Sequence, residues 1–545
     1  MKKKILATVL AATSLCSCFA GVGCGGGEKK DPNALQIAVV NVGYGAKWAT
    51  ELAKAYTEKT GTKVQVDDSY TGGLDKGFID ELLSNATETD IYFSRDSMFD
   101  YATSGTTAAG TYYECIMEDL TDFYTADNPY DDKTVAEKID PDILRDLTVQ
   151  RDGKNKQYTV PWVSDILGIL YNEKVFNDND LTVPKTTDQL VQLCFDIKKI
   201  DGLTPFVDSY SSSYFNVVQE HWMTQYEGCE TMDKLWQGYG ADGKRYTPSL
   251  LQYEGLLETY RVLYDLMNAE NNFIHKDSKD LTFTAAQNYI LNSQKGVAMM
   301  PNGDWIQREM EDNYDADEIE IQMMKMPVIS AINEKLSYYA DGNTEYCNLD
   351  AAKKAKYDKA LTAIIDYVDG TTTEKPTSVE GLTITDADIA RVDEARNIVT
   401  GWSFGHIGYI PTYSNKKDVA KDFLHFMVSD EGLRIFTEAT KGSTQPYKFD
   451  YLNDPRTSAV MNDFAKGVYN IFTESNVRAY EISKDPIFAH GGLTISYTWT
   501  ETSIVTAFTQ KKGGKNYYDA EGYFAYRYDY WKNKWDGILS AAGLI

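Results

Sequence analysis

The chain has 545 residues, 43% hydrophobic and 25% charged, with 81 Asp and Glu against 54 Lys and Arg and a formal net charge of −27. These proportions are those of a globular protein and not of a disordered or membrane-embedded one, and the acidity excludes a general affinity for nucleic acid or anionic lipid. The length exceeds one ordinary domain, so we expect at least two lobes with a cleft available between them.

The N-terminus has the pattern of an export signal over residues 1–23: three lysines, an apolar run and then small residues. The apolar run is too short for a membrane-spanning helix, and no later segment reaches the required ~18 uninterrupted apolar residues. Removal of the three lysines with the signal leaves 51 Lys and Arg, and a net charge of −30. Residues 24–34 are polar and glycine-rich, which is typical of a flexible tether.

The end of this signal resembles a bacterial lipobox, in which cleavage leaves a diacylated cysteine at the new N-terminus. We expect Cys24 to be lipidated, because GVGC is followed directly by the tether. Cys18 is the alternative, since a leucine stands three residues before it. A secreted protein that is cut elsewhere and carries no anchor is a second alternative.

The segment after the tether predicts a β-α-β unit. Ala49, Leu52 and Tyr56 fall on one helical face, and an apolar run stands on each side of that helix. Such a unit needs a right-handed crossover and a largely parallel sheet, so we expect an α/β lobe to begin here. The expected elements are a strand over 35–42, a helix over 46–59, a strand over 63–66, a helix over 78–85 and a strand over 90–94.

Two loops follow the carboxyl ends of these predicted strands. In parallel sheets the ligand crevice lies beyond those ends. The loop at Tyr44 and the loop that contains Arg95 and Asp96 are therefore candidate walls of a ligand site.

Residues 157–176, QYTVPWVSDILGILYNEKVF, predict two extended segments that are broken at Pro161 and at an exposed-type tryptophan, Trp162. The second segment contains an apolar run suited to a buried strand. Proline fixes its own φ and holds the preceding residue extended, so the chain passes through without coiling. We interpret this stretch as a strand that leaves one sheet and enters another, with Trp162 and Asp165 presented between two lobes.

A second lobe is predicted beyond this crossover. Helices are expected over 184–200 and 253–267. Thr186 and Gln189, three residues apart, have the pattern of a capping box at the start of the first of these helices.

A corner of the second lobe combines an aromatic ring with a carboxylate. A short buried strand over 297–300 is expected to turn at 301–303. Asp304 is expected to cap a helix that runs on from Trp305. A helix N-terminus beside these two side chains is a plausible ligand site.

Residues 331–400 interrupt the alternation of strands and helices, and we interpret them as an insertion. They contain two polar helix-like segments, 351–368 and 386–397, around a Thr/Pro/Gly-rich loop. The tail, 450–545, is rich in aromatic residues and is expected to pack mainly on the second lobe, with a terminal helix over 523–535.

The remaining cysteines and the five histidines carry no metal signature. Cys115, Cys194, Cys229 and Cys347 show no CxxC pairing, and the histidines show no HExxH or HxH spacing. We therefore expect no metal and no cofactor. The spacing leaves the disulfide state of the four cysteines open.

Four stretches together resemble the bacterial extracellular solute-binding proteins of ABC importers, in their sugar-binding group. They are the lipobox, the crossover at 157–176, the corner KGVAMMPNGDW at 295–305 and NKKDVAKDFLHFMVSDEGLRIFTEATKG at 415–442. The last is the most specific, because a strand that ends in Ile410 and Pro411 precedes the helix pattern A-x-x-F-L-x-F and then S-x-E-G. In this second pattern Ser429 is expected to cap the next helix. The insertion and the tail depart from the family pattern.

The resemblance implies an α/β fold of two lobes, similar to periplasmic binding proteins, with hinge crossovers and a ligand cleft between the lobes. The first lobe would comprise 35–160 and 401–449, and the second 161–330. The implied protein is a monomer, lipid-anchored on the outer face of the cytoplasmic membrane. It captures a carbohydrate, in our interpretation an oligosaccharide, by lobe closure and delivers it to the permease subunits of an ABC transporter.

The resemblance also implies the ligand contacts. Aromatic rings stack on the apolar faces of sugars, and carboxylates accept hydrogen bonds from their hydroxyls. Trp305 matches the family's stacking tryptophan. The further candidates are Trp162, Asp165, Asp304, Tyr44, Arg95, Asp96, Trp402 and Tyr409.

Two other functions compete with this interpretation. A secreted glycoside hydrolase needs two carboxylates ~5–10 Å apart across one bond, and the sequence identifies no such pair and no GxSxG elbow of a serine hydrolase. We therefore expect that the protein is not an enzyme. A lipid-anchored surface protein that holds glycans without feeding a transporter stays open as the alternative.

Overall fold

The computed structural model describes residues 31–70, 89–94, 105–106, 112–113, 115–211, 213–216, 218–315, 318–342, 344–400, 406–478, 485–489, 491–493 and 502–545. The predicted helix over 78–85 lies outside these ranges, as do Cys18, Cys24, Arg95, Asp96 and Trp402.

Two sheets organise the molecule. Among the described residues, the first has the strand order β2-β1-β3-β16-β8 and the second has the order β10-β11-β9-β12. The first comprises β1 (Leu35–Val40), β2 (Val64–Tyr70), β3 (Ile91–Ser94), β8 (Val160–Pro161) and β16 (Ile407–Tyr409). The second comprises β9 (Leu167–Asn172), β10 (Thr204–Phe206), β11 (Val297–Gly303) and β12 (Ile321–Met324). Each sheet is the centre of one lobe, called here the first lobe and the second lobe.

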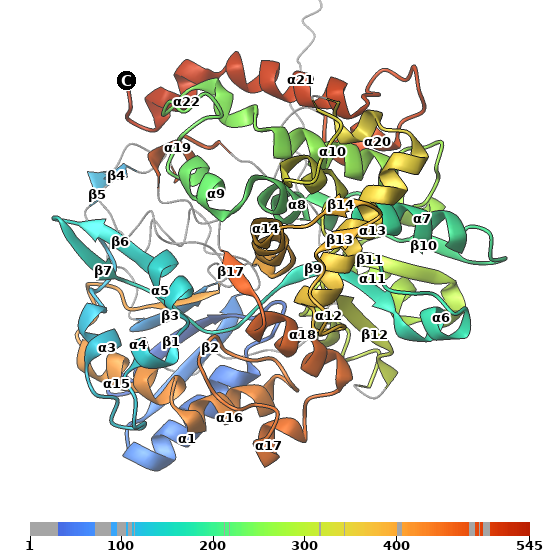
Figure 1. Ribbon diagram of the computed structural model, residues 1–545. Coiled ribbons are helices and arrows are strands. Elements are labelled where there is room, and N and C mark those ends of the chain that lie inside the picture. The colour runs from blue at the N-terminus through green and yellow to red at the C-terminus, as the bar shows by residue number, and fades with distance from the viewer. Residues whose placement is uncertain are drawn as a thin grey trace, which may run out of the picture.

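Helices cover both sheets, as Figure 1 shows. The helices of the described residues are α1 (Lys47–Thr60), α3 (Thr121–Thr125), α4 (Val135–Lys138), α5 (Pro141–Leu147), α6 (Glu173–Asp178), α7 (Thr187–Ile197), α8 (Val218–Glu227), α9 (Cys229–Trp236), α10 (Glu254–Met267), α11 (Phe283–Leu291), α12 (Ile306–Glu309), α13 (Ala351–Val368), α14 (Asp386–Arg396), α15 (Lys417–Met427), α16 (Asp430–Ala439), α17 (Pro455–Ser458), α18 (Asp463–Thr473), α19 (Pro486–Ala489), α20 (Ile504–Thr509), α21 (Ala520–Lys532) and α22 (Trp535–Ala541).

The first lobe begins with the predicted β-α-β unit. β1 is buried along its whole length and pairs in parallel with β2 and β3. Between β1 and β2, α1 buries Trp48, Leu52 and Tyr56 in the core of this lobe. The helix ends where Gly61 takes a left-handed φ of 78°, a conformation that glycine adopts without strain. The prediction of a parallel α/β sheet at this point is confirmed.

The chain crosses from the first sheet to the second between β8 and β9. β8 pairs with β16 at the edge of the first sheet, and β9 pairs with β11 and β12 in the second. The prediction of a strand that leaves one sheet and enters another is confirmed. The second extended segment is shorter than expected, because Asn172 caps α6 by accepting a hydrogen bond from the Val175 amide at 2.9 Å.

The start of α7 shows how a predicted cap is shared between neighbours. The Thr186 hydroxyl accepts a hydrogen bond from the Gln189 amide at 3.2 Å, as predicted. The reciprocal bond of a capping box is not made, because Gln189 Oε1 accepts from the Lys185 amide at 3.0 Å. Thr186 therefore makes one of the two hydrogen bonds of the predicted capping box. The helix begins at Thr187, directly after this cap.

The corner after β11 differs from the prediction in two ways. β11 runs through Gly303, so the expected turn at 301–303 is wrong, and antiparallel pairing of Gly303 with Leu167 keeps the segment extended. α12 begins after Trp305 without a side-chain cap. The expected capping role of Asp304 is therefore also wrong, because its carboxyl group makes other contacts, described below.

Helices from distant parts of the chain share the core of the second lobe. α13 and α14, from the segment interpreted as an insertion, contribute Tyr357, Leu361 and Val392 to that core. α21 lies along α10 at the top of Figure 1 and packs against it. The predicted terminal helix over 523–535 is in fact two helices, because α21 ends at Lys532 and α22 begins at Trp535.

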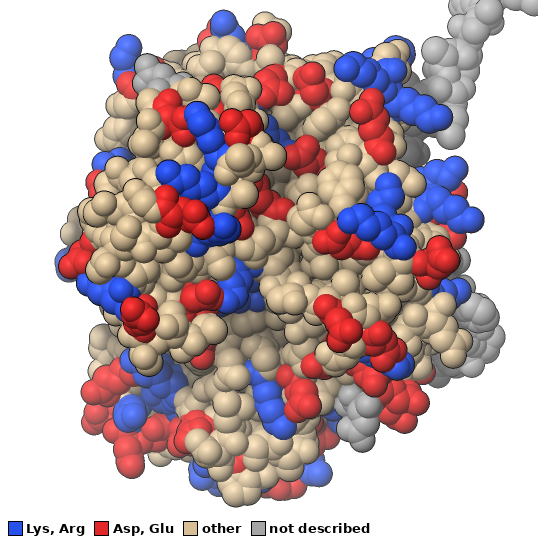
Figure 2. Space-filling view, turned by 45° about the vertical axis from the view of Figure 1, so that its right-hand side comes forward, with Lys and Arg blue, Asp and Glu red and all other residues tan. Residues whose placement is uncertain are grey.

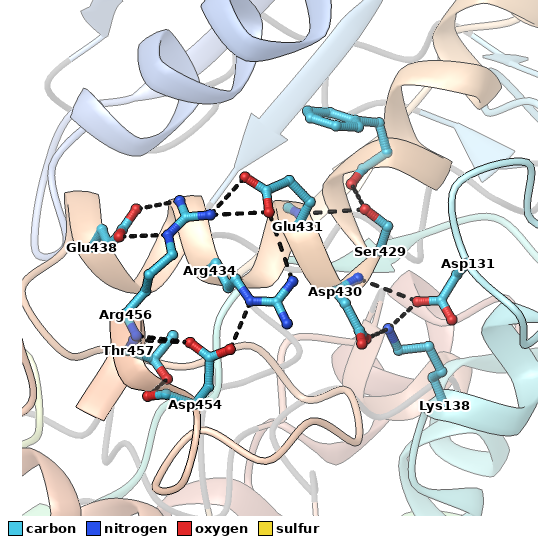
Figure 3. Close-up of polar contacts among 12 residues, drawn as sticks. Asp131, Lys138, Ser429, Asp430, Glu431, Arg434, Glu438, Asp454, Arg456 and Thr457 are labelled. Carbon is cyan, nitrogen blue, oxygen red and sulfur yellow. Dashed lines mark hydrogen bonds and ion pairs between the residues drawn. The ribbon is translucent and has the colours of Figure 1, made fainter. Parts of the chain in front are cut away.

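Ion pairs tie the helices that complete the first lobe (Figure 3). Ser429 caps α16, as the sequence predicts, by accepting a hydrogen bond from an amide in its first turn. Arg456, on α17, pairs with Glu431 at 2.8 Å and with Glu438 at 2.7 Å, both on α16. These pairs are partly exposed, so each contributes at most about 1 kcal/mol, and their main effect is to fix the position of α17.

Candidate ligand-binding site

Tyr44 lies in the loop that follows β1. Gly43 and Gly45 on either side take left-handed φ values of 57° and 69°. A Cβ on Gly45 would lie 3.2 Å from the guanidinium of Arg308, which belongs to the second lobe. The glycines thus allow a close approach of the two lobes, and Tyr44 is only 1% exposed at this contact.

Trp162 follows β8 and is 1% exposed, so its interpretation as an exposed-type tryptophan is wrong. Its ring stacks on Trp48 of α1, with centroids 4.8 Å apart and planes inclined by 20°. Its indole N–H donates a hydrogen bond to the Ser94 carbonyl at 3.0 Å. The ring is therefore packed into the first lobe.

Asp304 and Trp305 follow β11, at the edge of the second sheet where β9 begins. Tyr44 donates a hydrogen bond to Asp304 Oδ1 at 2.7 Å across the two lobes, and the Ile166 amide donates to the same oxygen at 3.3 Å. The Trp305 ring lies over Gly303, where a Cβ would come within 2.3 Å of it. Glycine at position 303 therefore allows the ring to lie against the end of the strand.

Three rings meet around Tyr44. The rings of Trp162, Trp305 and His406 each contact it edge-on, with centroids 6.0, 6.4 and 5.4 Å away. His406 immediately precedes β16, and its Nδ1 lies 3.1 Å from the carboxylate of the fully buried Asp165. The aromatic cluster, as it is called below, comprises Tyr44, Trp162, Asp165, Asp304, Trp305 and His406.

Tyr409 lies apart from this cluster. It pairs with Tyr92 in the first sheet, two positions along β16 from the pair of Ile407 and Ser94. Its ring stacks on Tyr92 with centroids 5.4 Å apart and is fully buried. The structure therefore makes Tyr409 part of the core of the first lobe. The candidates Arg95, Asp96 and Trp402 lie outside the described residues.

Sequence reasoning missed three residues of this region, namely His406, Asp208 and Tyr214. Tyr214, in a short 3-10 helix, contacts the Trp305 ring at 5.9 Å. Asp208 follows β10, which is parallel to β11, so it leaves the sheet at the same edge as Asp304. The rule that ligands bind beyond the carboxyl ends of parallel strands would have selected Asp208, because it stands directly after a short apolar run.

The two lobes touch at the aromatic cluster. Arg308 Nε donates a hydrogen bond to the Tyr44 carbonyl at 3.3 Å, and Gln307 Nε2 donates to the Lys441 carbonyl at 3.3 Å. The cavity that Asp304 lines between the lobes measures about 20 Å³, room for about one water molecule. Small-molecule sites measure about 300–1,000 Å³. A ligand can therefore reach the cluster only when the lobes move apart.

Burial raises the pKa of three acidic groups in this region, namely Asp304, Tyr44 and Asp208. It raises the pKa of Asp304 to about 8, and the charge of Asp165 acts in the same direction. Burial likewise raises the pKa of Tyr44 well above its usual value, with Asp304 adding to the effect, and raises the pKa of Asp208 to about 7. Near neutral pH Asp304 is a protonated acid in this conformation, and it can both donate and accept hydrogen bonds.

Asp304→Asn is expected to remove a pH dependence of stability. The folded chain holds the Asp304 proton up to about pH 8, whereas an unfolded aspartate loses it near 3.9. As the pH rises from about 4 to about 8, the folded state therefore binds up to about one more proton than the unfolded state, and the free energy of unfolding falls. Denaturant unfolding at steps of pH should show this fall in the wild type and a flatter profile in Asp304→Asn.

Asp312→Asn is the matched control for this experiment, because Asp312 is exposed and lies in the same part of the chain. It should keep the wild-type profile. Parallel profiles for Asp304→Asn and the wild type would contradict the protonated state of Asp304.

Outside the cluster, the charged side chains and the cysteines of the described residues form no metal site and no disulfide. Acidic and basic side chains are interspersed over the face seen in Figure 2. Within the described ranges, no three His, Cys, Asp or Glu side chains gather as a metal site, and no helix is long and apolar enough to cross a membrane. Among these residues no disulfide joins Cys115, Cys194, Cys229 or Cys347.

Solved structures with this fold span most of the chain. The GacH receptor of Streptomyces glaucescens, solved unliganded and with acarbose, has a TM-score of 0.56 at 14% identity, covering 92% of this chain and 99% of its own. A probable secreted solute-binding lipoprotein from Streptomyces coelicolor has a TM-score of 0.55 at 12% identity, covering 92% and 100%. The solute-binding protein RafE, solved with raffinose, has a TM-score of 0.53 at 14% identity, covering 92% and 99%. At these sequence identities, the similarity to the solved structures is a similarity of fold alone.

The sequence itself identifies the family. No curated protein matches the chain, but the family model described as bacterial extracellular solute-binding protein matches residues 43–368, more than half of it. The fold is the one predicted, with two lobes on separate sheets joined by a crossing strand. The chain therefore belongs to the family of bacterial extracellular solute-binding proteins.

Proposed function

We propose that the protein is the lipid-anchored solute-binding component of an ABC importer and that it captures a carbohydrate between its lobes. The observation that carries this proposal is the aromatic cluster, where rings and protonated or buried carboxyl groups of both lobes meet. Rings stack on the apolar faces of sugars, and carboxyl groups bind their hydroxyls. Closure over the sugar would create the form that the permease recognises.

The printed descriptions of the relatives support this cargo and location. Acarbose and raffinose are the compounds named for two of the solved structures, and a third is described as a secreted lipoprotein. The export pattern and Cys24, with Cys18 as the alternative, support the same attachment here. The 39 Tyr and 9 Trp supply many rings, which favours a glycan over a solute that is not a sugar, and we propose an oligosaccharide.

We also propose a division of the chain into two lobes, an insertion and a tail. Residues 35–160 and 401–449 form the first lobe, 161–330 the second, 331–400 an insertion, and 450–545 a tail mainly on the second lobe. The positions of α13, α14 and α21 in the core of the second lobe support the last two assignments.

A thermal-unfolding experiment tests the proposed cargo. The exported chain, without its signal, is heated with mono- and oligosaccharides, peptides and polyamines in turn. A ligand at 100 times its Kd stabilises the folded state by about 2.7 kcal/mol, which raises the unfolding temperature measurably. We expect this rise with at least one carbohydrate and no chemical product. A rise with peptides or polyamines alone would overturn the carbohydrate proposal.

The same carbohydrate separates transport from simple glycan retention. The loaded protein is added to vesicles that contain a candidate ABC permease from the same organism, and ATP hydrolysis is measured. Stimulation by the loaded protein supports the importer. Binding without stimulation would favour a surface glycan-binding lipoprotein, and a cleaved sugar would favour a glycoside hydrolase.

A further inference from the structure

A second cavity lies beside the crossover between the lobes. It measures about 290 Å³ and is enclosed by the start of α5, residues 444–449 and the end of α18. This is about the size at which small-molecule sites begin. The cavity is called the hinge cavity below, and its walls include Gln445, Tyr447, Phe449, Tyr469, Phe472 and Ser475.

The walls of the hinge cavity belong to both lobes. α18 packs on β12 of the second sheet, and Phe464 and Val468 join the side chains around that sheet. The α5 side is fixed in the first lobe, where Ile139 and Ile143 are fully buried in the core. Figure 1 shows α18 between β12 and the helices of the first lobe. α18 also contacts the first lobe, because Tyr469 and Phe472 pack against its core and the Tyr469 hydroxyl donates to the Phe449 carbonyl at 3.1 Å. This helix therefore bridges the two lobes at the cavity.

Three hydrogen bonds join the wall of this cavity to the crossover itself. The Tyr447 hydroxyl donates to the Pro161 carbonyl at 3.0 Å, and Gln445 Nε2 donates to the Trp162 carbonyl at 3.0 Å. The Ser164 amide donates to the carbonyl of residue 444 at 2.8 Å. Residues 444–447 thus hold the strand that must bend or rotate when the lobes part.

The chemistry of the walls defines the class of ligand. Tyr447, Phe449, Tyr469 and Phe472 provide aromatic surface. Gln445 is 2% exposed, and its Oε1 accepts no hydrogen bond from any residue that the structure describes. A buried acceptor that receives no hydrogen bond lowers the stability of the folded state. The cavity therefore suits a molecule with a flat apolar ring and one N–H or O–H group.

Lys138, Asp140 and Lys448 are the charged residues at the cavity. Lys138 is 1% exposed and pairs with Asp131 and, at 2.7 Å, with Asp430 (Figure 3). Asp140 accepts a hydrogen bond from the Asp142 amide at 2.8 Å as the cap of α5. Lys448 is exposed, and its ammonium donates to the Glu137 carbonyl at 3.4 Å. Because the buried charge, that of Lys138, is paired within the protein, the buried part of the cavity suits a neutral molecule.

We propose that the hinge cavity is a second binding site, for a small neutral molecule of one or two fused rings with one hydrogen-bond donor, and that its occupancy favours the conformation in which the lobes touch. The expected effect on conformation rests on α18, which contacts both lobes while Tyr44 and Asp304 are in contact. A ligand held between α5 and α18 adds contacts to that conformation and shifts the population towards it. A carbohydrate that closes the lobes strengthens binding at the hinge cavity by the same factor by which the hinge-cavity ligand strengthens carbohydrate binding. Only this reciprocal effect rests on the proposed function.

Binding is tested on the whole exported chain with indole as the probe and benzofuran as its control. The two molecules have nearly the same shape, but benzofuran has no N–H group. We expect indole to bind with one site and a Kd below about 1 mM, and benzofuran to bind roughly three- to tenfold more weakly because Gln445 Oε1 stays without a donor. Absence of indole binding at 5 mM, roughly five times that Kd, would overturn the site, and equal affinities would overturn the role of Gln445.

Two filling variants locate the site. Ser475→Phe introduces a ring at a cavity wall, and Thr473→Trp narrows the cavity from an exposed position at the end of α18. Ser540→Phe, on an exposed position of α22, is the matched control. Both filling variants should weaken indole binding at least tenfold, whereas the control should not. Full indole binding by the filling variants would place the probe elsewhere and overturn the proposal.

The effect on the lobes is measured without any sugar, by small-angle X-ray scattering. Indole at saturation should lower the radius of gyration of the wild type and leave that of Thr473→Trp unchanged. An unchanged radius in the wild type, with indole bound, would overturn the coupling. A failure of every carbohydrate to bind would overturn the proposed function and leave these results unaffected, so the two proposals fail separately.

Discussion

Trp305→Ala is expected to weaken binding of the carbohydrate by roughly 100-fold, about 2.7 kcal/mol. The Trp305 ring lies between Tyr44 of the first lobe and Tyr214 of the second, with centroids 6.4 and 5.9 Å away. A sugar that enters when the lobes part replaces the contact with Tyr44 and stacks on the exposed ring face. Calorimetric titration of the variant with the sugar from the thermal-unfolding panel measures the loss.

Trp535→Ala is the matched control for this variant. Trp535 is 6% exposed and Trp305 is 5% exposed, but Trp535 lies at the start of α22, in the core of the second lobe. Removal of either buried ring should lower stability by about 3–5 kcal/mol, so unfolding is measured beside affinity. Only Trp305→Ala should lose affinity in its folded form. An unchanged affinity in Trp305→Ala, or equal losses in both variants, would contradict a role in stacking.

Trp162→Ala is expected to lower the free energy of unfolding by about 3–5 kcal/mol. The ring is 1% exposed and stacks on Trp48, and its N–H satisfies the Ser94 carbonyl. The variant therefore leaves a cavity and removes a buried hydrogen bond. Denaturant unfolding measures the change, and Trp162→Phe, which keeps a ring but has no N–H, should lose less.

A double-mutant cycle with Trp48 tests the stacking itself. An offset-stacked pair contributes about 0.5–1.5 kcal/mol beyond its buried area. The combined loss in Trp48→Ala/Trp162→Ala should therefore be smaller than the sum of the two single losses by about that amount. Strict additivity would contradict the stacking, and a full loss of affinity with unchanged stability would return Trp162 to the ligand contacts.

The two tryptophans show why the candidate site was only partly predictable. Both follow a predicted strand and stand within three residues of an aspartate, so the local pattern alone does not distinguish them. In the structure Trp162 packs on α1, whereas Trp305 lies at the contact of the two lobes. Which side chain a ring contacts depends on segments more than 100 residues away, and local patterns contain no information about them.

The ends of the elements show a similar limit. The local sequence predicted α13 to the residue, as a polar helix-like segment, and Ser429 as the cap of α16, because both depend on side chains within one or two turns. The turn at 301–303 was wrong because β9 pairs with that segment and keeps it extended. The capping role of Asp304 was wrong because Tyr44, 260 positions away, donates to its carboxyl group.

By itself, the sequence determined the α/β class, the alternation of strands and helices, the strand that crosses between sheets and the family. These follow from hydrophobic period, proline geometry and motif order, which act along the chain and over short distances. Only the tertiary structure decided that the lobes touch through Tyr44 and Asp304, that Tyr409 belongs to the core, that Tyr214 contacts the Trp305 ring and that His406 contacts the Tyr44 ring. Burial then sets the protonation of Asp304, because loss of water disfavours its charge only after distant segments have closed around it.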